Sequence, residues 1–385
     1  MTQSLTDPME LLLPVIVAHR GEAEKRRQLS EDVFSAIRES GLLGMPTSEA
    51  HGGLGTPLPE MLSIYEAIAY EDAAVSWVMW NAGLIGFYAR YMPQTLREEL
   101  FADRNKLICQ STIPAGELHQ DDSKAVVCGR WPLMSGSPGA DWAVLSCRLF
   151  KDGQPVLGEA GMPEIVLAAV PRDAFNIIDT WHTSGLRGTG SHDIEIEDVA
   201  VPEHRIFSFA NDSVIAGPSD RLPIFACVSA IFAAQLLGLG RAVFDHALDR
   251  GTNLITPGPM PDPRDRSEYQ IAIARHGEAL DVAGERLRAK AEIVWTNATD
   301  GNRPHPEAIT ALYAAGFQVI ETVKSAVAEL HDLSGTSALY ESSPIEKRMR
   351  DLRAMLRHIV AQPMMQADVG RVKLGLQPDW PLFFL

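Results

Sequence analysis

Apolar residues recur at intervals of three and four along the first hundred residues of the chain, and this spacing predicts helices. The pattern is clear in 32–45, DVFSAIRESGLLGM, which Gly41 and Gly44 close, and in a longer segment, 60–92, which Pro93 ends. The loop between them, PTSEAHGGLGTPLP (46–59), is rich in turn-forming residues. The beginning of the chain is therefore expected to be helical.

The pattern changes near residue 107, where short runs rich in β-branched residues alternate with Gly, Pro and Asp turns. Such runs predict β-strands, because successive side chains of a strand point to opposite faces of a sheet. Four of them are KAVVCGRW (124–131), WAVLSCRLF (142–150), PEIVLAAV (163–170) and HDIEIEDVAVP (192–202). A β domain is expected between the helical regions.

Helical periodicity returns after about residue 219 and predicts four long helices at 222–250, 266–298, 306–332 and 344–374, the last interrupted by Pro363. The Pro- and Asp-rich piece 256–266 predicts a mobile loop. The 19 residues from Leu222 to Gly240 carry no charge. They contain Ser229 and Gln235 and lead into the amphipathic RAVFDHALDR, which favours a helix buried in a bundle over a membrane span.

This order of patterns predicts a mostly helical α+β protein with three domains: an N-terminal helical domain at 1–106, a central β-barrel domain at 107–206, and a C-terminal four-helix bundle at 207–385. A length of 385 residues is in keeping with two or three packed domains.

Composition narrows the choice of function. Lys and Arg number 34 against 50 Asp and Glu, a formal net charge of −16, which argues against a general nucleic-acid binder. The four cysteines form no Cys-x-x-Cys pair, so the sequence encodes neither a recognisable zinc site nor a disulfide framework. The start of the chain lacks the basic and apolar regions of a signal peptide, and we expect a reduced, cytoplasmic location.

Common catalytic motifs are missing from the sequence: there is no phosphate-binding P-loop, no His-Glu-x-x-His and no Gly-x-Ser-x-Gly. The glycines of LGLGRA (236–241) lie inside a predicted helix, where a dinucleotide loop is not expected. His182 and His192 flank a loop and could bind a metal. Without a Cys or carboxylate at ligand spacing, ordinary loop histidines are the favoured interpretation, and no metal site is predicted.

Two loops carry hydroxyl groups at the ends of predicted strands. In 129–145 a strand with Trp131 runs into Ser135 and Gly136, and in 179–205 a loop rich in Thr, Ser and Gly precedes a strand. Hydroxyls and exposed backbone N–H groups on rigid strand ends suit a polar, planar cofactor. Composition alone favours the alternative of two hairpin loops beside packing tryptophans.

Four segments, taken together and in order, resemble the acyl-CoA dehydrogenase-like flavoprotein superfamily: GLLGMPTSEAHGGLG (41–55), W-x-x-x-S-G…A-x-W (131–142), WHTSGLRGTGS (181–191) with the following VP, and SPIEKRMRDLRAMLRH (343–358). The resemblance implies the three-domain fold described above. It also implies a homotetramer that holds flavin between domains and subunits.

The resemblance assigns the cofactor-binding residues. It places the hydroxyl of Ser135 at flavin N5, and it implies flavin contacts for Ser135, Gly136, Thr189, Gly190, Ser191, Ser334, Gly335, Arg350 and Asp351. Ser334 and Gly335 lie in HDLSGTS (331–337), which matches the region that reaches the cofactor of a neighbouring subunit. The dehydrogenases usually have two adjacent glycines there, and this chain has only Gly335.

The superfamily contains two main chemistries. Its dehydrogenases use a glutamate to remove a proton from an acyl thioester. In most members this glutamate lies eight residues after the Asp of an Arg-Asp pair, where this chain has Ile359. In the isovaleryl-type members it corresponds to about Asp220, which is one methylene shorter. The expected glutamate is missing at both places.

Two-component flavin monooxygenases, such as the p-hydroxyphenylacetate hydroxylase oxygenase component and dibenzothiophene monooxygenase, carry a His seven residues after that Asp, as Asp351 and His358 do here. A spacing of seven predicts that both residues share one face of a helix. An imidazole there could deprotonate the substrate or steady a flavin C4a-hydroperoxide. The alternative for His358 is a packed helix histidine bonded to a carbonyl.

The resemblance and the sequence together predict an oxygenase component with His358 and Ser135 as catalytic residues. It would receive FMNH2 or FADH2 from a separate NAD(P)H-dependent flavin reductase, react with O2, and oxygenate a small aromatic, phenol- or indole-like substrate. The expected substrate pocket is lined by Trp77, Trp80, Asn81, Ser111 and Thr112. The two tryptophans could sandwich a flat substrate or could be core packing. The alternative functions are an acyl-CoA dehydrogenase with a displaced base and a catalytically silent scaffold.

Overall fold

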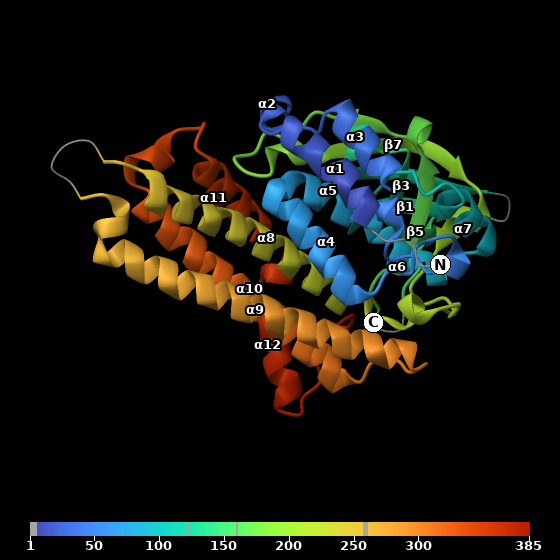
Figure 1. The fold of residues 1–385 in the computed structure, drawn as a ribbon. Coiled ribbons are helices and arrows are strands. Elements are labelled where there is room, and N and C mark those ends of the chain that lie inside the picture. The colour runs from blue at the N-terminus through green and yellow to red at the C-terminus, as the bar shows by residue number, and fades with distance from the viewer. Residues whose placement is uncertain (1–5, 122–123, 159–160, 257–260) are drawn as a thin grey trace. The chain divides into compact units, whose positions relative to one another are not determined.

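The computed structural model describes residues 6–121, 124–158, 161–256 and 261–385. The chain forms two compact units. The first unit contains residues 1–56, 77–183 and 187–220, and the second contains residues 57–76, 184–186 and 221–385. Figure 1 shows the elements coloured along the chain. Each unit therefore takes segments that are far apart in the sequence.

The first unit combines short helices with the sheet. Its helices are α1 (Thr6–Ala18), α2 (Glu22–Arg26), α3 (Glu31–Glu39), most of α5 (Ala73–Gly83), α6 (Ile85–Tyr88) and α7 (Gln94–Phe101). α3 begins at Ser30, whose hydroxyl accepts a hydrogen bond from the N–H of Val33, and its buried residues are Val33, Phe34 and Ile37. The predicted helix at 32–45 therefore ends early, at Glu39, and a 3₁₀ turn at Leu42–Gly44 follows Gly41.

A single eight-stranded sheet forms the core of the first unit. Its strands are β1 (Ile108–Gln120), β2 (Ala125–Met134), β3 (Trp142–Lys151), β4 (Gln154–Pro155), β5 (Ile165–Pro171), β6 (Asn176–Ile178), β7 (His192–Val201) and β8 (Ile206–Phe207). They pair in the order β6-β7-β2-β1-β3-β5-β8, with β4 on β3, and only the β1–β3 pair is parallel. The four predicted strands correspond to β2, β3, β5 and β7.

β1 was not among the predicted strands, although it lies at the centre of the sheet. Pro114 interrupts its sequence, and the register with β3 shifts between Ser111 and Gly116, so its apolar residues do not alternate. A side chain at Gly116 would lie 1.9 Å from the ring of Trp131, which is fully buried. The glycine is needed because the indole occupies that space, and the Trp131 N–H donates to the carbonyl of Ser146 at 2.8 Å.

The second unit is helical. It contains α4 (Leu58–Glu71), α8 (Ile224–Asn253), α9 (Ser267–Thr299), α10 (Pro306–Leu333), α11 (Pro344–Met355) and α12 (Pro363–Lys373). The long helices α8, α9 and α10 run alongside one another (Figure 1). α4 packs closely on α8, because a Cβ at Gly238 of α8 would lie 2.1 Å from the backbone oxygen of Glu66. Residues 257–260 of the predicted mobile loop lie outside the described residues.

Helix α8 is long and apolar enough to cross a membrane, but 89% of its most apolar stretch of 18 residues is buried inside the protein. The buried stretch runs almost without interruption from Ile224 to Val243, so the helix is covered on every side by its neighbours. The expectation of a core helix agrees with this burial. Ser229 and Gln235 are among its fully covered residues.

Two predicted helices are divided in the structure. The predicted helix at 60–92 is broken at Asp72, which is extended and whose carboxylate accepts the N–H of Ala74 at 2.8 Å to begin α5. The predicted helix at 344–374 ends at Met355 rather than at Pro363, and Pro363 instead begins α12. Proline at a first helical position lacks only an N–H that would have no partner there.

The predicted fold class is confirmed: N-terminal helices, a central sheet and C-terminal helices follow one another along the chain. The three domain boundaries stay predictions. The compact units divide the chain differently, since the N-terminal helices and the sheet fall together and α4 belongs with the C-terminal helices. All four cysteines are free thiols.

Candidate functional site

Three hydroxyls and one indole N–H form a connected group in the first unit, which we call the hydroxyl cluster: Ser135, Thr189, Ser191 and the N–H of Trp77. The Trp77 Nε1–H donates to the Ser135 oxygen at 3.0 Å. The oxygens of Ser135 and Ser191 lie 2.7 Å apart, as do those of Ser191 and Thr189. The four side chains are all buried. Two of the predicted cofactor loops therefore meet through their side chains.

The sheet positions this cluster. Ser135 follows β2 directly and Ser191 precedes β7, and the ends of these strands pair through Met134 and His192. The N–H of Gly136 donates to the carbonyl of Thr189 at 2.9 Å, which joins the two loops a second time. Gly136 has a φ of 75°, in the left-handed region that favours glycine.

A hydroxyl both donates and accepts, so the hydrogen bonds of the cluster can run in either direction. In one direction Thr189 donates to Ser191 and Ser191 donates to Ser135. Ser135 then accepts from both Ser191 and Trp77, and its own hydrogen is left to be donated to a ligand. A ligand acceptor would select this direction, and a ligand donor such as the N5–H of reduced flavin would select the opposite one, so the residues fit the contact that the resemblance implies.

The two tryptophans do not form a slot with each other. The rings of Trp77 and Trp80 lie edge to face, with centroids 5.0 Å apart and planes at 62°. Two parallel walls are needed to sandwich a flat molecule, so this predicted arrangement is wrong for the pair as it stands. Trp80 is only 1% exposed, as a core residue would be. Trp77 instead has a polar role through its N–H.

The other predicted substrate residues are less concentrated. The Asn81 amide is half-buried and donates to the carbonyl of Trp77, one turn earlier in α5, at 3.0 Å. The Ser111 hydroxyl is buried in β1 and accepts the N–H of Ile113 at 3.2 Å, whereas Thr112 is exposed. No contact among Asn81, Ser111 and Thr112 is seen in the part of the chain that the structure describes, and a shared substrate pocket stays a prediction.

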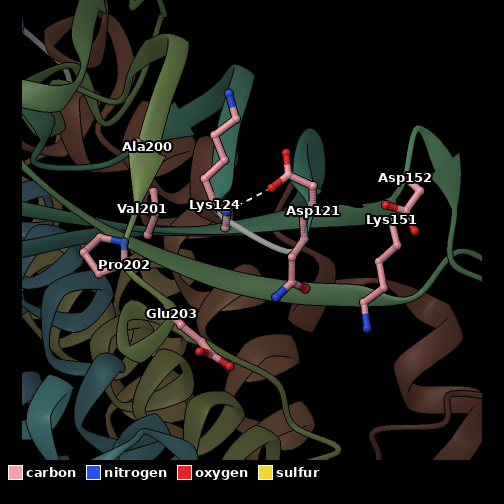
Figure 2. A pocket seen from close by; sticks show the side chains of 10 residues that line it. Asp121, Lys124, Lys151, Asp152, Ala200, Val201, Pro202 and Glu203 are labelled. Carbon is pink, nitrogen blue, oxygen red and sulfur yellow. Dashed lines mark hydrogen bonds between the residues drawn. The ribbon is translucent and has the colours of Figure 1, made fainter.

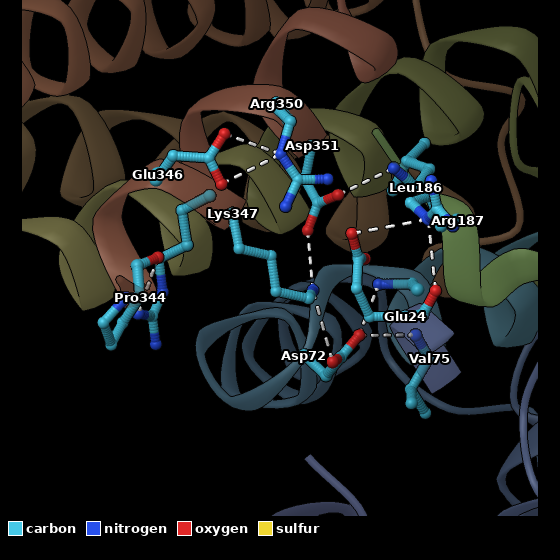
Figure 3. Close-up of polar contacts among 12 residues, drawn as sticks. Glu24, Asp72, Val75, Leu186, Arg187, Pro344, Glu346, Lys347, Arg350 and Asp351 are labelled. Atoms are coloured by element: carbon cyan, nitrogen blue, oxygen red, sulfur yellow. Dashed lines mark hydrogen bonds and ion pairs between the residues drawn. The ribbon is translucent and has the colours of Figure 1, made fainter. Parts of the chain in front are cut away.

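A second polar group lies in the second unit, where α11 meets residues 184–186. We call it the loop anchor: Lys347, Arg350 and Asp351 with the backbone of 184–186 (Figure 3). The Asp351 carboxylate is 1% exposed and accepts the N–H of Leu186 at 2.7 Å and the ammonium of Lys347 at 2.7 Å. Lys347 also reaches the Asp72 carboxylate at 3.4 Å.

Arg350 completes the loop anchor. Its guanidinium donates to both oxygens of Glu346, at 2.8 and 3.0 Å, and to the carbonyl of Ser184 at 2.5 Å. Gly185 lies so close to the helix that a Cβ would stand 2.1 Å from the Arg350 backbone oxygen. Arg350 and Asp351, predicted as cofactor-binding residues, thus hold the backbone just before the 187–191 segment. A direct contact of either residue with flavin stays a prediction.

His358 is not on the helix that carries Asp351. α11 ends at Met355, and His358 is extended, before a short 3₁₀ turn at Ile359–Ala361. The predicted shared face is therefore wrong, because the helix ends three residues too early. The His358 ring stacks on Phe232 with centroids 5.8 Å apart, and its Nδ1 accepts the N–H of Val360 at 3.4 Å.

Burial lowers the pKa of His358 to about 4, so the ring is neutral near pH 7. When Nδ1 accepts the Val360 N–H, the ring hydrogen is on Nε2. A neutral ring in this tautomer carries its hydrogen on Nε2 and is a weak base. Of the two predicted roles for His358, this geometry favours steadying an oxygen by hydrogen bonding over deprotonating a substrate.

Ser334 and Gly335 lie at the end of α10. The Ser334 hydroxyl is buried and donates to the carbonyl of Leu330 at 2.8 Å. Gly335 has a φ of 60°, and a Cβ there would meet nothing within 4 Å. The side chain of Ser334 thus closes its own helix, and its predicted contact with a neighbouring subunit's cofactor stays a prediction.

Comparisons with known proteins match both ends of the chain to one family. The family models for the acyl-CoA dehydrogenase N-terminal domain and C-terminal domain match residues 11–102 and 230–363. The chain belongs to the acyl-CoA dehydrogenase-like flavoprotein superfamily. In the sequence, the first match precedes the strands of the sheet and the second follows them.

Whole-length relatives of this superfamily member are monooxygenases. It is 26% identical to the flavin-dependent monooxygenase oxygenase subunit HsaA of Rhodococcus jostii, over 92% of this chain and 94% of the relative. It is also 26% identical to indole-3-acetate monooxygenase of Pseudomonas putida, over 94% and 91% of the two chains. The solved structure of XiaF from Streptomyces sp., in complex with FADH2 and glycerol, has the same fold, with a TM-score of 0.88, 24% identity, and coverage of 98% of this chain and 96% of that one.

Neither position expected for the base of an acyl-CoA dehydrogenase carries a glutamate in this superfamily member. Position 359 is an exposed isoleucine in a 3₁₀ turn. Asp220 is 4% exposed, and one of its oxygens accepts the N–H groups of Ala216 and Gly217 at 3.0 and 2.9 Å. That oxygen closes its own turn and also lies 3.6 Å from His51 Nε2.

His182 and His192, the two loop histidines of this superfamily member, lie near a carboxylate that sequence spacing did not reveal. His192 Nδ1 and His182 Nε2 are 3.4 and 3.5 Å from one oxygen of Asp179. Arg27 pairs with the same carboxylate at 2.6 Å and holds the pKa of Asp179 down at about 2. The guanidinium already neutralises the carboxylate, which keeps the histidines in an ordinary ion-pair cluster.

The first unit also has a surface cavity of about 610 Å³ at the ends of β1, β2, β3 and β7 (Figure 2). It is lined mostly by charged and polar residues, among them Asp121, Lys124, Lys151, Asp152 and Glu203. None of the predicted site residues lines it. An aromatic substrate needs mainly apolar walls, so this cavity does not suit one.

Sequence reasoning missed two functional features of the site. The Trp77 N–H was not predicted to bond Ser135, although an indole on a helix beside a hydroxyl loop is a common donor. Lys347 was not predicted at all, although it lies four residues before Asp351, a spacing at which opposite charges pair on a helix.

Proposed function

We propose that the protein is the oxygenase component of a two-component flavin-dependent monooxygenase that oxygenates a small aromatic or heteroaromatic compound. Relatives aligned over nearly the whole chain carry that enzyme class in their names, and one of them acts on indole-3-acetate. Reduced flavin would supply the reactive oxygen as a C4a-hydroperoxide after O2 binds. The hydroxyl cluster is the observation in this structure that carries the proposal.

In this reaction the hydroxyl cluster would hold one proton in place. Trp77 donates to Ser135 at 3.0 Å and Ser191 lies 2.7 Å away, so the Ser135 hydroxyl can donate to a ligand or accept from one, depending on the direction of its hydrogen bond with Ser191. When Ser135 donates to Ser191, its oxygen would accept the N5–H of a reduced flavin, and a hydrogen bond that keeps this proton on N5 would oppose the loss of hydrogen peroxide. A buried cluster also excludes the water that would deliver a competing proton.

His358 would act separately, through its Nε2–H. Its pKa of about 4 keeps it neutral at physiological pH, and its stacking on Phe232 fixes the ring plane. A neutral donor can stabilise an oxygen that gains negative charge during the transfer, without first losing a proton of its own.

The partners follow from this assignment. A separate NAD(P)H-dependent reductase would deliver FMNH2 or FADH2. We also propose a homotetramer in the cytoplasm, with Ser334 and Gly335 near a neighbouring copy. The adjacent Leu339 and Tyr340 are 77% and 68% exposed, which is unusual for large apolar side chains and suits a surface that a second copy covers. Light scattering of the purified protein tests the oligomer.

The first experiment mixes anaerobically reduced FMN or FAD and the protein with oxygenated buffer in a stopped-flow instrument. We expect a transient hydroperoxide absorbance that outlasts the one seen with free flavin. Ser135→Ala should shorten it and release more hydrogen peroxide. Ser229→Ala, which removes a buried hydroxyl of α8, is the matched control and should leave the decay unchanged.

Reoxidation as fast as that of free flavin, in wild type and variant alike, would overturn the proposal. An acyl-CoA panel with an artificial electron acceptor then tests the dehydrogenase alternative. A panel of phenols and indoles, scored for oxygenated product per flavin oxidised, tests the substrate class. Product from neither panel, with no effect of Ser135→Ala, would favour a silent scaffold.

A further inference from the structure

Three side chains with metal-binding atoms gather on one face of the sheet, away from the hydroxyl cluster. Glu117 of β1 lies directly opposite Cys128 of β2, and His119 is two residues further along β1. Residues two apart on a strand, and residues opposite each other on neighbouring strands, point to the same face. We call Glu117, His119 and Cys128 the β-face triad.

The ligand atoms of the β-face triad converge. The carboxylate of Glu117, the imidazole of His119 and the sulfur of Cys128 each offer an atom within 4.8 Å of the others. His119 Nε2 and Glu117 Oε2 are 3.0 Å apart. Tetrahedral zinc with bonds of about 2.0–2.3 Å needs its ligand atoms about 3.3–3.7 Å apart, so small side-chain rotations bring all three to bonding distance.

Neighbouring residues hold two of the three ligands in place. Arg148 of β3, in register with Glu117, donates to its other oxygen, Oε1, at 2.9 Å and leaves Oε2 facing His119. The His119 ring stacks on Phe150 with centroids 4.8 Å apart and planes at 23°. Such second partners orient ligands and are a usual part of metal sites.

The charges around the β-face triad favour a cation. Asp198 of β7 is near enough to act electrostatically on the Cys128 thiol, as Glu117 does. The carboxylates of Glu117 and Asp198 place two negative charges near Cys128, and Arg148 donates to Glu117. A divalent ion would compensate this negative charge, and the Cys128 thiol would release its proton on binding the ion.

We propose that Glu117, His119 and Cys128 bind a divalent ion of the zinc class, with one carboxylate, one imidazole and one thiolate ligand and a fourth position open to water. Zinc accepts this set of ligands, and three protein ligands with an open position are typical of reactive rather than purely structural sites. The ligands come from two paired strands, which is why no Cys-x-x-Cys spacing marks them in the sequence. The site does not depend on the proposed oxygenase function.

The test titrates cobalt(II) into the tag-free, full-length protein after treatment with a chelator, and then displaces cobalt with zinc. Cobalt bound to a thiolate gives a near-ultraviolet charge-transfer band, and tetrahedral cobalt gives strong visible bands. We expect both bands to saturate at one ion per chain and to disappear when zinc is added.

Variants assign the ligands. Cys128→Ser should remove the charge-transfer band, and His119→Gln should weaken binding by at least about 10–100-fold, the loss that removal of an outer-shell partner already causes. Cys227→Ala and His182→Gln are matched controls that remove a cysteine and a histidine elsewhere, and both should bind cobalt as wild type does. Zinc should raise the Tm of wild type but not that of Cys128→Ser, which gives a readout independent of colour.

Absence of a charge-transfer band at one equivalent of cobalt would overturn the proposal and leave the β-face triad as a hydrogen-bonded surface group. An unchanged band in Cys128→Ser would also overturn it, because the thiolate would then come from another cysteine. Circular dichroism of each variant shows whether a loss of binding is instead a loss of folding. Should a variant unfold, the zinc-dependent Tm of wild type together with its cobalt bands decides the proposal.

Discussion

The hydroxyl cluster and the loop anchor contain most of the residues that the family resemblance assigns to flavin, yet their chemistry differs. In the hydroxyl cluster every side-chain group is neutral, and each hydroxyl can turn to donate in either direction. In the loop anchor, Asp351 accepts from Leu186 and Lys347, and Arg350 is bonded to Glu346 and Ser184. The first group can redirect a proton to a ligand, whereas the second fixes a stretch of backbone.

This difference separates two kinds of functional residue. Changes in the loop anchor should mainly alter stability, because buried charges lose partners that they need. Changes in the hydroxyl cluster should mainly alter the outcome of the reaction, because they remove a donor from a network that can still satisfy its other members. The following four predictions test that contrast, and the largest effect comes first.

Asp351→Ala should have the largest effect. It leaves the Lys347 ammonium and the Leu186 N–H without the carboxylate, and removal of one partner from a buried pair costs about 3–5 kcal/mol. Thermal unfolding should show a large fall in Tm, with turnover per folded molecule close to wild type. The Tm of Asp351→Asn should fall less, because asparagine keeps an acceptor for the Leu186 N–H. Equal stability of wild type, Asp351→Ala and Asp351→Asn would contradict the expected difference between the loop anchor and the hydroxyl cluster.

The second prediction concerns the pH dependence of stability, and it tests whether the His358 ring of the second unit is neutral. The folded state holds the pKa of His358 at about 4, against about 6.5 for an unfolded histidine. Above about pH 6.5 the ring is neutral in both states and contributes no pH dependence. As pH falls from about 6.5 to 4 the unfolded chain takes up the proton first, so unfolding becomes easier by up to about 3 kcal/mol.

Denaturant unfolding of wild type and His358→Gln at about pH 7 and about pH 4.5 measures this effect, since glutamine carries no titrating group. We expect the variant to lose less stability on acidification. Parallel losses in the two proteins would mean that His358 titrates normally and is not the neutral donor proposed above.

Gly185→Ala tests the backbone of the loop anchor. The new methyl group would lie 2.1 Å from the Arg350 carbonyl oxygen, which cannot move without α11, and the forced shift should cost about 1–3 kcal/mol. Gly370→Ala in α12 is the control, because a Cβ there meets nothing within 4 Å. Alanine is a better helix former than glycine, so the control should be as stable as wild type or more so. Chemical denaturation compares the two.

Trp77→Phe should have the smallest effect on stability and a selective effect on coupling. It keeps an aromatic ring at this position but removes the N–H that donates to Ser135. The lost hydrogen bond is worth about 0.5–1.5 kcal/mol, which corresponds to a rise of about 2–10-fold in the ratio of peroxide to product. Trp80→Phe removes an indole N–H from the same helix without touching Ser135 and serves as the control. An equal rise of peroxide in both variants would assign the effect to packing of α5.

Much of the sheet could be predicted from alternation alone, because β2, β3, β5 and β7 combine regular β-branched runs with clear turns. β1 could not, since Pro114 and the irregular register near Gly116 interrupt its pattern, and the need for a glycine at 116 comes from the packed Trp131 ring. The break at Asp72 was visible in principle as an N-cap residue inside an apolar helix. No comparable capping residue in the sequence indicates that α11 ends at Met355.

The candidate site shows the same limit. The family resemblance named Ser135, Thr189 and Ser191, and the structure brings them together. It could not show that Asp351 and Arg350 bind loop backbone, because this depends on how closely Gly185 approaches α11. The β-face triad was hidden for a similar reason, since pairing of two strands, and not spacing along one, joins His119 to Cys128.

The membership of α4 in the second unit has a consequence for how the protein is made. α4, whose buried residues include Leu62, Tyr65 and Ile68, packs against α8, and the strands of the sheet lie between the two helices in the sequence. A chain growing from its N-terminus must therefore carry α4 uncovered until the ribosome has released α8. Truncation before α8 should yield an aggregating fragment instead of a free-standing N-terminal domain, and nascent chains of that length are natural clients for chaperones.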